Sequence, residues 1–179
     1  MTNASSRFNN DLRYRAEDHP NQTQLTPDYV LEPVREALGG TIGLDPCNTP
    51  DNPTRAFRSI CLPDDGLTED WGVHSTIYVN PPYGKAREPW VKKCIEAASV
   101  GRSVVLLIPA ATDTRIFQEA LASADEVVFI KGRVKFGVLR PNRRQQAASH
   151  PSALIGWNVS LAACAHLGLL VQGGLADAA

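Results

Sequence analysis

Residues 76–83, with the sequence TIYVNPPY, decide how this chain folds. Their first half is a β-branched and aromatic run of the kind that forms a buried strand. The two prolines that follow Asn80 cannot continue a strand ladder, because neither has a backbone N–H. The chain therefore leaves the sheet at Asn80 on a stiff loop. Since open α/β sheets place their chemistry at the carboxyl ends of strands, this loop is a candidate functional site; the alternative is an ordinary turn, which Asn-Pro often begins.

The composition is that of a single globular domain. The chain has 179 residues, of which 43% are hydrophobic, and no apolar run approaches the ~18 residues of a membrane span. Four cysteines and four histidines are scattered without the spacing of a metal site, so neither a metal nor a disulfide framework is expected. The N-terminus is polar and has no apolar leader segment, and with the dispersed cysteines it predicts a cytoplasmic protein.

Helices and strands alternate along the chain. Apolar residues at helical spacing predict helices near 26–38, 88–98 and 113–122. Short apolar runs predict strands near 41–44, 59–62, 76–79, 103–108 and 127–130. Residues 152–157 are also apolar, but Pro151 and Gly156 blur the kind of element they form. Residues 133–138 are expected to fold back from Gly132 as a hairpin, whereas 161–171 fits either a strand or a helix. The alternation predicts a three-layer α/β sandwich with a largely parallel sheet.

Three segments make up the expected domain organisation. Residues 1–24 are rich in Asn, Arg, Asp and Ser without a helical or strand period, and are expected to form a flexible arm. Residues 25–172 are expected to form the domain, whose first helix begins with Thr26 as N-cap and Pro27 at the first position. Residues 173–179 are expected to be a frayed tail.

The tetrad Asn80-Pro81-Pro82-Tyr83 resembles the catalytic motif of amino-group methyltransferases that use S-adenosylmethionine, above all the DNA adenine-N6 family. Members of that family carry, in order, a Thr-Pro pair, an acid after the first strand, an acid before the catalytic strand, and the tetrad. The block at 132–136 (GRVKF) is similar to the phage-type Dam adenine methyltransferases. The resemblance covers residues 26–155 and implies a Rossmann-like class I methyltransferase fold, in the cytoplasm of a bacterial or phage-infected cell. The earlier members of the ordered set are Thr26-Pro27, Leu44-Asp45-Pro46-Cys47 and Asp65-Gly66-Leu67.

This resemblance assigns the chemistry to the tetrad. The exocyclic amine of adenine is a poor nucleophile, because its lone pair is delocalised into the ring. The Asn80 side-chain oxygen and a backbone carbonyl of Pro81-Pro82 would each accept one N–H bond from that amine and draw it towards tetrahedral geometry. Tyr83 would stack on a base flipped out of the duplex. Catalysis would then be positioning plus oriented acceptors, and no shifted pKa is required.

The same resemblance implies a pocket for S-adenosylmethionine. Asp45 and the backbone that follows it would lie at the methionine end of the cofactor. Asp65 would accept a bond from the cofactor's adenine amine, and Thr26 would contact its carboxylate. The alternative for each aspartate is a turn or cap residue. The full set of expected cofactor-binding residues is Thr26, Pro27, Asp45, Pro46, Cys47, Asp65, Gly66 and Leu67.

One loop departs from the pattern of the family. The usual first loop is glycine-rich, so that backbone can approach the cofactor, but here Asp45 is followed by Pro-Cys-Asn-Thr-Pro-Asp-Asn-Pro. The span from the first strand to Asp65 is also too short for a full helix and strand. Two explanations are open: the fold is trimmed near its second strand, or the cofactor pocket is degraded.

A basic segment follows the strand predicted at 127–130. It contains no acidic residue and is expected to bind DNA phosphates, with an affinity that depends on salt and little on sequence. The alternative is a solvated surface loop. The expected DNA-contacting residues are Lys131, Arg133, Lys135, Phe136, Arg140, Arg143 and Arg144.

The favoured function is a DNA adenine-N6 methyltransferase, with S-adenosylmethionine as cofactor and DNA as partner, and with neither a metal nor a membrane. An enzyme that methylates RNA or a protein amide is a second interpretation. A third, from a different class, is a catalytically silent module of the same fold that binds nucleic acid or a partner protein. The missing loop glycines favour this third interpretation.

Overall fold

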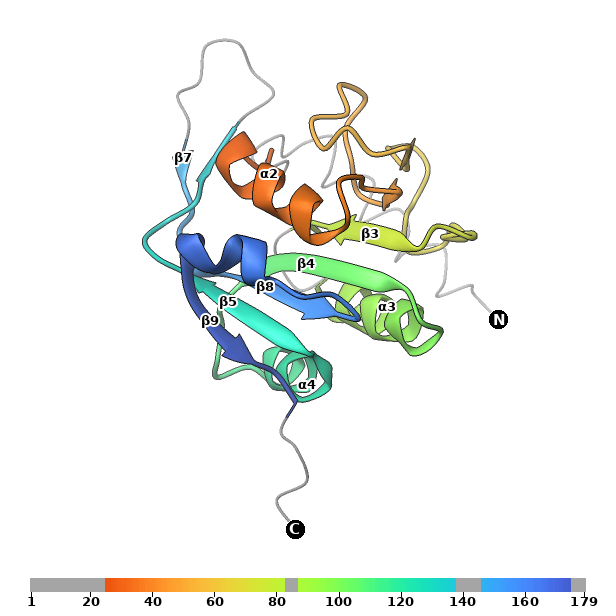
Figure 1. Ribbon diagram of the computed structural model, residues 1–179. Coiled ribbons are helices and arrows are strands. Elements are labelled where there is room, and N and C mark those ends of the chain that lie inside the picture. Colours follow the sequence, from red (N-terminus) through yellow and green to blue (C-terminus); the bar gives the residue numbers. More distant parts are fainter. Residues whose placement is uncertain (1–24, 83–86, 138–145, 175–179) are drawn as a thin grey trace, which may run out of the picture.

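The computed structural model describes residues 25–82, 87–137 and 146–174 of the chain. The expected N-terminal arm and residues 175–179 of the expected tail lie outside the described residues. A seven-stranded sheet runs through the described part, with the strand order β2-β1-β3-β4-β8-β5-β9 (Figure 1). Its strands are β1 (Leu44–Asp45), β2 (Arg58–Ser59), β3 (Thr76–Val79), β4 (Ser103–Pro109), β5 (Glu126–Ile130), β8 (Ser152–Trp157) and β9 (Gly168–Gln172).

The sheet is mixed, and the expectation of a largely parallel sheet holds for one half of it only. β1 pairs in parallel with β2 and β3, and β3 pairs in parallel with β4. β8 then runs antiparallel between β4 and β5, and β9 runs antiparallel beside β5. A parallel connection needs a crossover, usually a helix. Along the chain, helix α3 (Arg87–Ser99) follows β3 and precedes β4, and α4 (Arg115–Ser123) follows β4 and precedes β5. The described chain from β5 to β8 holds no helix.

Helices cover both faces of this sheet and give the three layers that the alternation predicts (Figure 1). Helix α2 (Asp28–Ala37) and the 3-10 helix η2 (Ala162–Leu167) lie on one face, and α3 and α4 lie on the other. Val30, Val34 and Leu38 are buried against the sheet, as their spacing predicts. None of the helices in the described ranges has the length and apolar character to cross a membrane.

In the second half of the chain, one expectation is corrected and one open alternative is decided. Residues 133–137 do not fold back on β5, because β5 already has β8 on one side and β9 on the other; Val138, the last residue of the expected hairpin, lies outside the described residues. Instead β6 (Lys135–Phe136) pairs antiparallel with β7 (Gln146–Ala147) in a separate two-stranded sheet. The ambiguous stretch 161–171 contains both kinds of element, since η2 is followed directly by β9.

The pairing of β1 with β3 positions the candidate site. Leu44 lies beside Ile77 in parallel register. Because parallel strands end at the same edge of a sheet, residues 46–48 and 80–82 emerge next to each other. β1 and β2 are only two residues long each, which agrees with a fold trimmed near its second strand.

Candidate functional site

Asp45 ends β1 as a buried carboxylate, 3% exposed. Its Oδ1 accepts a hydrogen bond from the Cys47 N–H at 3.0 Å, and its Oδ2 accepts one from the Thr54 hydroxyl at 2.9 Å. Burial raises the pKa of the Asp45 carboxyl from 3.8 to about 6, and these hydrogen bonds oppose the rise. This edge of the sheet therefore holds an acid that changes its charge just below neutral pH.

The glycine-less loop after β1 is held by its own side chains. The Asn48 amide nitrogen lies within hydrogen-bonding distance of Asn52 Oδ1 (2.6 Å), Thr54 Oγ1 (2.9 Å) and Ser59 Oγ (2.8 Å). Asn52 has a positive φ of 44°, which Asn tolerates better than most residues. Neither Asn48 nor Thr54 stands out in the sequence. The signal that could have found them is the density of Asn and Pro over residues 46–54, which is typical of turns held by side chains.

The loop that carries Asp65 lies directly on the loop after β1. A Cβ built on Gly66 would lie 1.9 Å from the Pro46 carbonyl oxygen, so only glycine allows this approach. Leu67 and Cys47 both pack against the core cluster on the α3 side of the sheet. The two loops predicted to form one pocket are therefore neighbours in the structure.

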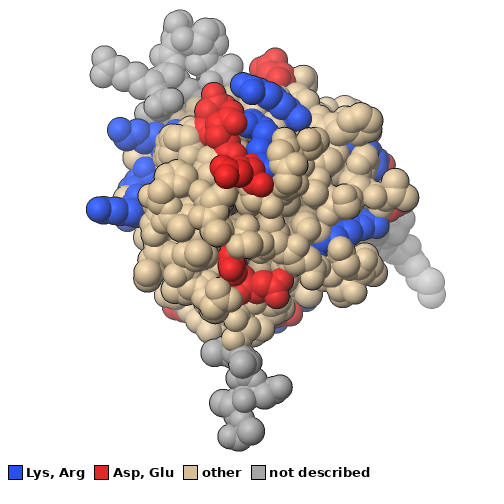
Figure 2. Space-filling model, viewed as in Figure 1, with Lys and Arg blue, Asp and Glu red and all other residues tan. Residues whose placement is uncertain are grey.

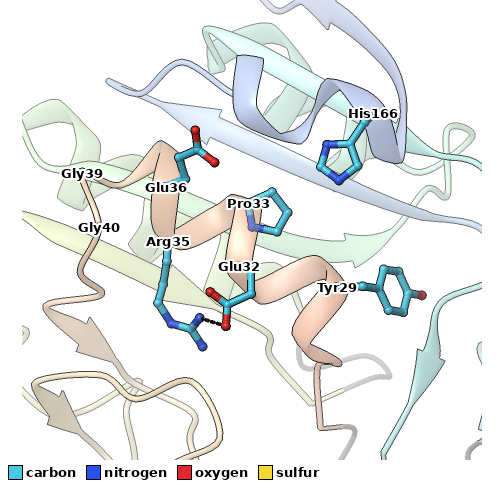
Figure 3. Close-up of a pocket in the computed structure, with 8 residues that line it drawn as sticks. All are labelled: Tyr29, Glu32, Pro33, Arg35, Glu36, Gly39, Gly40 and His166. Atoms are coloured by element: carbon cyan, nitrogen blue, oxygen red, sulfur yellow. Dashed lines mark ion pairs between the residues drawn. The ribbon is translucent and has the colours of Figure 1, made fainter.

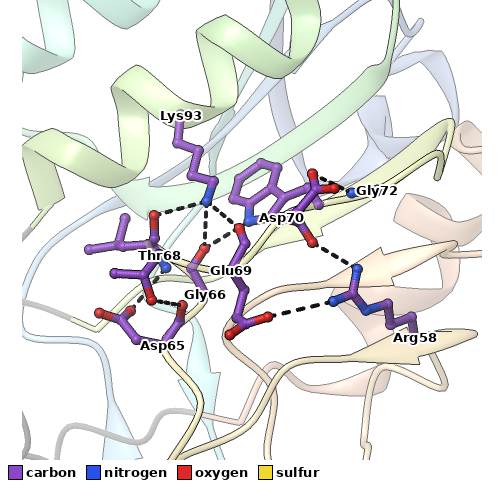
Figure 4. Close-up of polar contacts among 10 residues, drawn as sticks. Arg58, Asp65, Gly66, Thr68, Glu69, Asp70, Gly72 and Lys93 are labelled. Atoms are coloured by element: carbon purple, nitrogen blue, oxygen red, sulfur yellow. Dashed lines mark hydrogen bonds and ion pairs between the residues drawn. The ribbon is translucent and has the colours of Figure 1, made fainter.

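Lys93 of α3 holds the backbone of the second loop (Figure 4). Its ammonium donates to the carbonyls of Gly66, Leu67 and Glu69 at 3.0, 2.9 and 2.6 Å. Asp65 Oδ1 accepts the Leu67 N–H at 2.9 Å. The turn that is the alternative role for Asp65 is therefore present, and a role in binding has to be tested separately from it.

Asn80 begins the loop after β3 and contacts two of the other candidate residues. Its Nδ2 donates to the Thr26 hydroxyl at 3.1 Å, and Thr26 Oγ1 lies 2.7 Å from the Tyr78 hydroxyl. Its backbone also hydrogen-bonds the Cys47 thiol, whose pKa is raised by burial. The expectation that Thr26 caps the first helix is wrong, because Pro27 occupies the N-cap and makes no side-chain cap bond.

Part of the predicted site lies outside the described residues. Within the tetrad, Pro81 is buried and Pro82 is exposed where the loop leaves the sheet. The structure therefore places the first three residues of the tetrad at the shared edge. The predicted residues outside the described ranges are Tyr83, Arg140, Arg143 and Arg144.

The basic segment is only partly as expected. Lys131, Arg133 and Lys135 are exposed. Phe136 is instead 1% exposed in the core, because successive strand residues point to opposite sides, and its expected contact with DNA is not supported. Figure 2 shows Lys and Arg side chains along the left edge of the molecule, the side on which β6 and β7 lie in Figure 1.

The rest of the described surface holds a groove but no metal site. The groove, about 780 Å³, lies over α2 and is bordered by Gly39, Gly40 and His166 (Figure 3). Two of its charged side chains form an ion pair with each other, because Arg35 lies 2.7 Å from the Glu32 carboxylate. None of the predicted site residues that the structure describes lines this groove. The described ranges contain no group of three His, Cys, Asp or Glu side chains that could hold a metal ion.

Fold and site together define an α/β domain whose polar loops gather at the carboxyl ends of two neighbouring parallel strands. A model of the DNA N-6-adenine-methyltransferase (Dam) family matches residues 16–162, which is most of the chain. The protein therefore belongs to this family, and the family resemblance seen in the sequence is confirmed. A DNA N-6-adenine-methyltransferase of Escherichia phage T1 is 34% identical over 61 residues, which cover 34% of this chain and 25% of the phage protein.

Replacing Asp45 by Asn should change how stability depends on pH. Because the pKa of Asp45 is raised in the folded state, the contribution of this group to stability is fully present below about pH 4 and is lost as pH rises through about 6. Asp45→Asn should therefore gain about 3 kcal/mol relative to wild type between about pH 4 and pH 8. Urea unfolding at several pH values measures this difference.

The exposed Asp51 on the same loop supplies the control for this prediction. Asp51→Asn should show little change relative to wild type across the same pH range. An Asp45→Asn difference that does not vary with pH would mean that Asp45 is not a buried titrating group.

Proposed function

We propose that this protein transfers a methyl group from S-adenosylmethionine to the exocyclic N6 amine of adenine in DNA. The observation that carries the proposal is the contact of Asn80 with both Thr26 and Cys47 at one sheet edge. Three elements of the ordered motif set, far apart in the sequence, therefore lie together. They do so in a chain of the adenine-N6 family, at the edge where α/β sheets bind ligands.

Asn80 would act through its side-chain oxygen. An amide oxygen and a backbone carbonyl of Pro81-Pro82 are neutral acceptors, which hold an amine by its hydrogens without protonating it. Two consecutive prolines fix the backbone, so the carbonyl direction is set before the substrate arrives. Tyr83 would complete the site by stacking on the flipped base.

The residues of the pocket fit the chemistry of S-adenosylmethionine. When bound, the cofactor supplies a methyl group on a positively charged sulfonium, and it also carries an amine, a carboxylate and an adenine. Asp45 is a buried carboxylate, the kind of group that a nearby cation stabilises in its ionised form. Asp65 would accept the cofactor's adenine amine, and Gly66 allows its loop to reach the Asp45 side. Thr26-Pro27 would form the wall towards the cofactor carboxylate, with the backbone N–H of Thr26 as its donor.

Two alternatives differ from this proposal in substrate or in activity. The exposed basic side chains before and in β6 favour a nucleic acid over a protein amide as substrate. A silent module was suggested by the missing loop glycines. The hydrogen bonds of Asn48 give that loop a defined construction without glycine, which supports a working pocket. Titration calorimetry with S-adenosylmethionine separates a working pocket from a silent one.

The first test of the proposal is Asn80→Ala. The loss of one oriented acceptor should lower the rate of methyl transfer by about 10²–10³, while the affinity for S-adenosylmethionine stays near that of wild type. Asn80→Asp keeps acceptor oxygens at this position and should retain more activity than Asn80→Ala. The assay is transfer of a labelled methyl group to adenine-containing duplex DNA. Methylation by Asn80→Ala at the wild-type rate would contradict the role of Asn80.

A second test separates the binding role of Asp65 from its turn. Asp65→Asn keeps an oxygen that can accept the Leu67 N–H, but it places an NH₂ group where the cofactor's amine would donate. Both Asp65→Asn and Asp65→Ala should weaken S-adenosylmethionine binding by about 1.5–3 kcal/mol in calorimetry. The exposed neighbour Asp64→Asn is the control. A wild-type affinity of Asp65→Asn for S-adenosylmethionine would show that Asp65 only stabilises its turn.

A third test addresses how DNA is held. If Lys131, Arg133 and Lys135 contact phosphates, each contact should contribute about 0.9 to the slope of log affinity against log salt. Changing all three to Ala should flatten that slope by about two to three, measured by fluorescence anisotropy on duplex DNA. As control, Lys92 and Arg115 of α3 and α4, which pair with Glu88, are changed to Ala. Equal slopes in wild type and the triple variant would show that the segment is only solvated.

A further inference from the structure

Tyr78 lies in β3 and Asn80 follows the end of this strand, and their side chains lie on the same side of it. Side chains alternate along a strand, so residues two apart point the same way. Tyr78 is fully buried in the core cluster under α2. Thr26, just before α2 and 6% exposed, lies over both side chains, at 2.7 Å from the Tyr78 hydroxyl and 3.1 Å from Asn80 Nδ2.

The Thr26 hydroxyl connects the two side chains directly. A threonine hydroxyl has one hydrogen to donate and two lone pairs to accept with. One lone pair accepts a hydrogen bond from Asn80 Nδ2. The hydroxyl hydrogen or the second lone pair forms the hydrogen bond with the Tyr78 hydroxyl. Since Thr26 and Tyr78 are both buried, water cannot replace either partner without cost.

This contact fixes the direction of the Asn80 amide. Because Nδ2 faces Thr26, the amide oxygen at the other end of the group faces away from Thr26. An amide turned the other way would present a donor to the adenine amine, which is itself a donor. The direction of the amide therefore decides whether Asn80 offers an acceptor to the substrate.

We propose that Thr26 and Tyr78 are positioning residues for Asn80, which set the direction of its amide for methyl transfer. This inference rests on the proposed function. It gives Thr26 a role distinct from the contact with the cofactor carboxylate that the family resemblance implies. A positioning role predicts a loss of kcat, whereas a cofactor contact predicts a loss of cofactor affinity.

The test compares Thr26→Val, Thr26→Ser and Tyr78→Phe. Val keeps the shape of Thr without its hydroxyl, so Thr26→Val should lower kcat by about 10²-fold while cofactor affinity stays unchanged. Thr26→Ser restores the hydroxyl and should recover most of that loss. Tyr78→Phe removes the second hydroxyl and should lower kcat with the same unchanged affinity. Kinetics on duplex DNA and titration calorimetry give the two quantities.

Thr76, at the other end of β3, supplies the matched control. Its hydroxyl also makes two hydrogen bonds, accepting the Gly43 N–H at 2.9 Å and donating to the Thr41 carbonyl at 3.0 Å. Thr76→Val should lose stability without the selective loss of kcat. The side-chain amide signals of Asn80 in ¹⁵N-asparagine-labelled protein, identified by their absence in Asn80→Ala, should move in Thr26→Val and stay in place in Thr76→Val.

Three results would overturn the inference. One is weaker cofactor binding in Thr26→Val with kcat preserved, which would make Thr26 a cofactor contact. Another is an equal loss of kcat in Thr26→Val and Thr76→Val in proportion to lost stability. The third is an unchanged Asn80 amide signal in Thr26→Val. If the wild type neither binds S-adenosylmethionine nor methylates DNA, the proposed function fails by itself, and the amide signal still decides the positioning.

Discussion

The parallel pairing of Leu44 with Ile77 is the constraint on which the candidate site depends. It makes β1 and β3 end at the same edge, so that the Asp45 loop and the Asn80 loop leave the sheet side by side. A register shift of one residue would turn Asp45 to the opposite face and separate it from Thr54. The prolines after Asn80 then keep the second loop from continuing the ladder, so the chain leaves the sheet at that edge.

The loop after β1 shows how a chain can build this edge without glycine. Glycine permits close backbone approach, whereas here the amide of Asn48 reaches across the loop to Thr54 and to Ser59 of β2. Thr54 in turn donates to the buried carboxylate of Asp45. Buried polar groups are costly unless hydrogen-bonded, so these bonds both order the loop and lower the cost of burying Asp45. The close backbone approach between Pro46 and Gly66 uses the glycine of the other loop.

The helices and strands that could be predicted from the sequence are those that local residue patterns determine. β3, α3 and β4 were predicted because a β-branched run and helical apolar spacing need no tertiary context. The direction of β8 and the pairing partner of β6 could not be predicted from local patterns, since they depend on which edges of β5 are already occupied. Asn48 escaped notice because the fold alone brings it to Ser59, and Tyr78 because an aromatic residue in a strand looks like ordinary core. The candidate loops were found because a family motif, and not periodicity, marks them.

Helix α2 connects the two halves of the candidate site. Just before its first turn, Thr26 hydrogen-bonds Asn80. Near its last turn, the buried Arg35 donates through Nε to the Thr54 carbonyl at 3.3 Å, and Thr54 holds the Asp45 carboxylate. The segment 26–37, which consists of Thr26-Pro27 and α2, therefore contacts the acceptor proposed for the substrate amine and the loop proposed for the cofactor. A displacement of α2 would disturb both at once, because a rigid helix transmits movement along its length. This explains in physical terms why a Thr-Pro pair far from the tetrad in sequence belongs to the same ordered set of motifs.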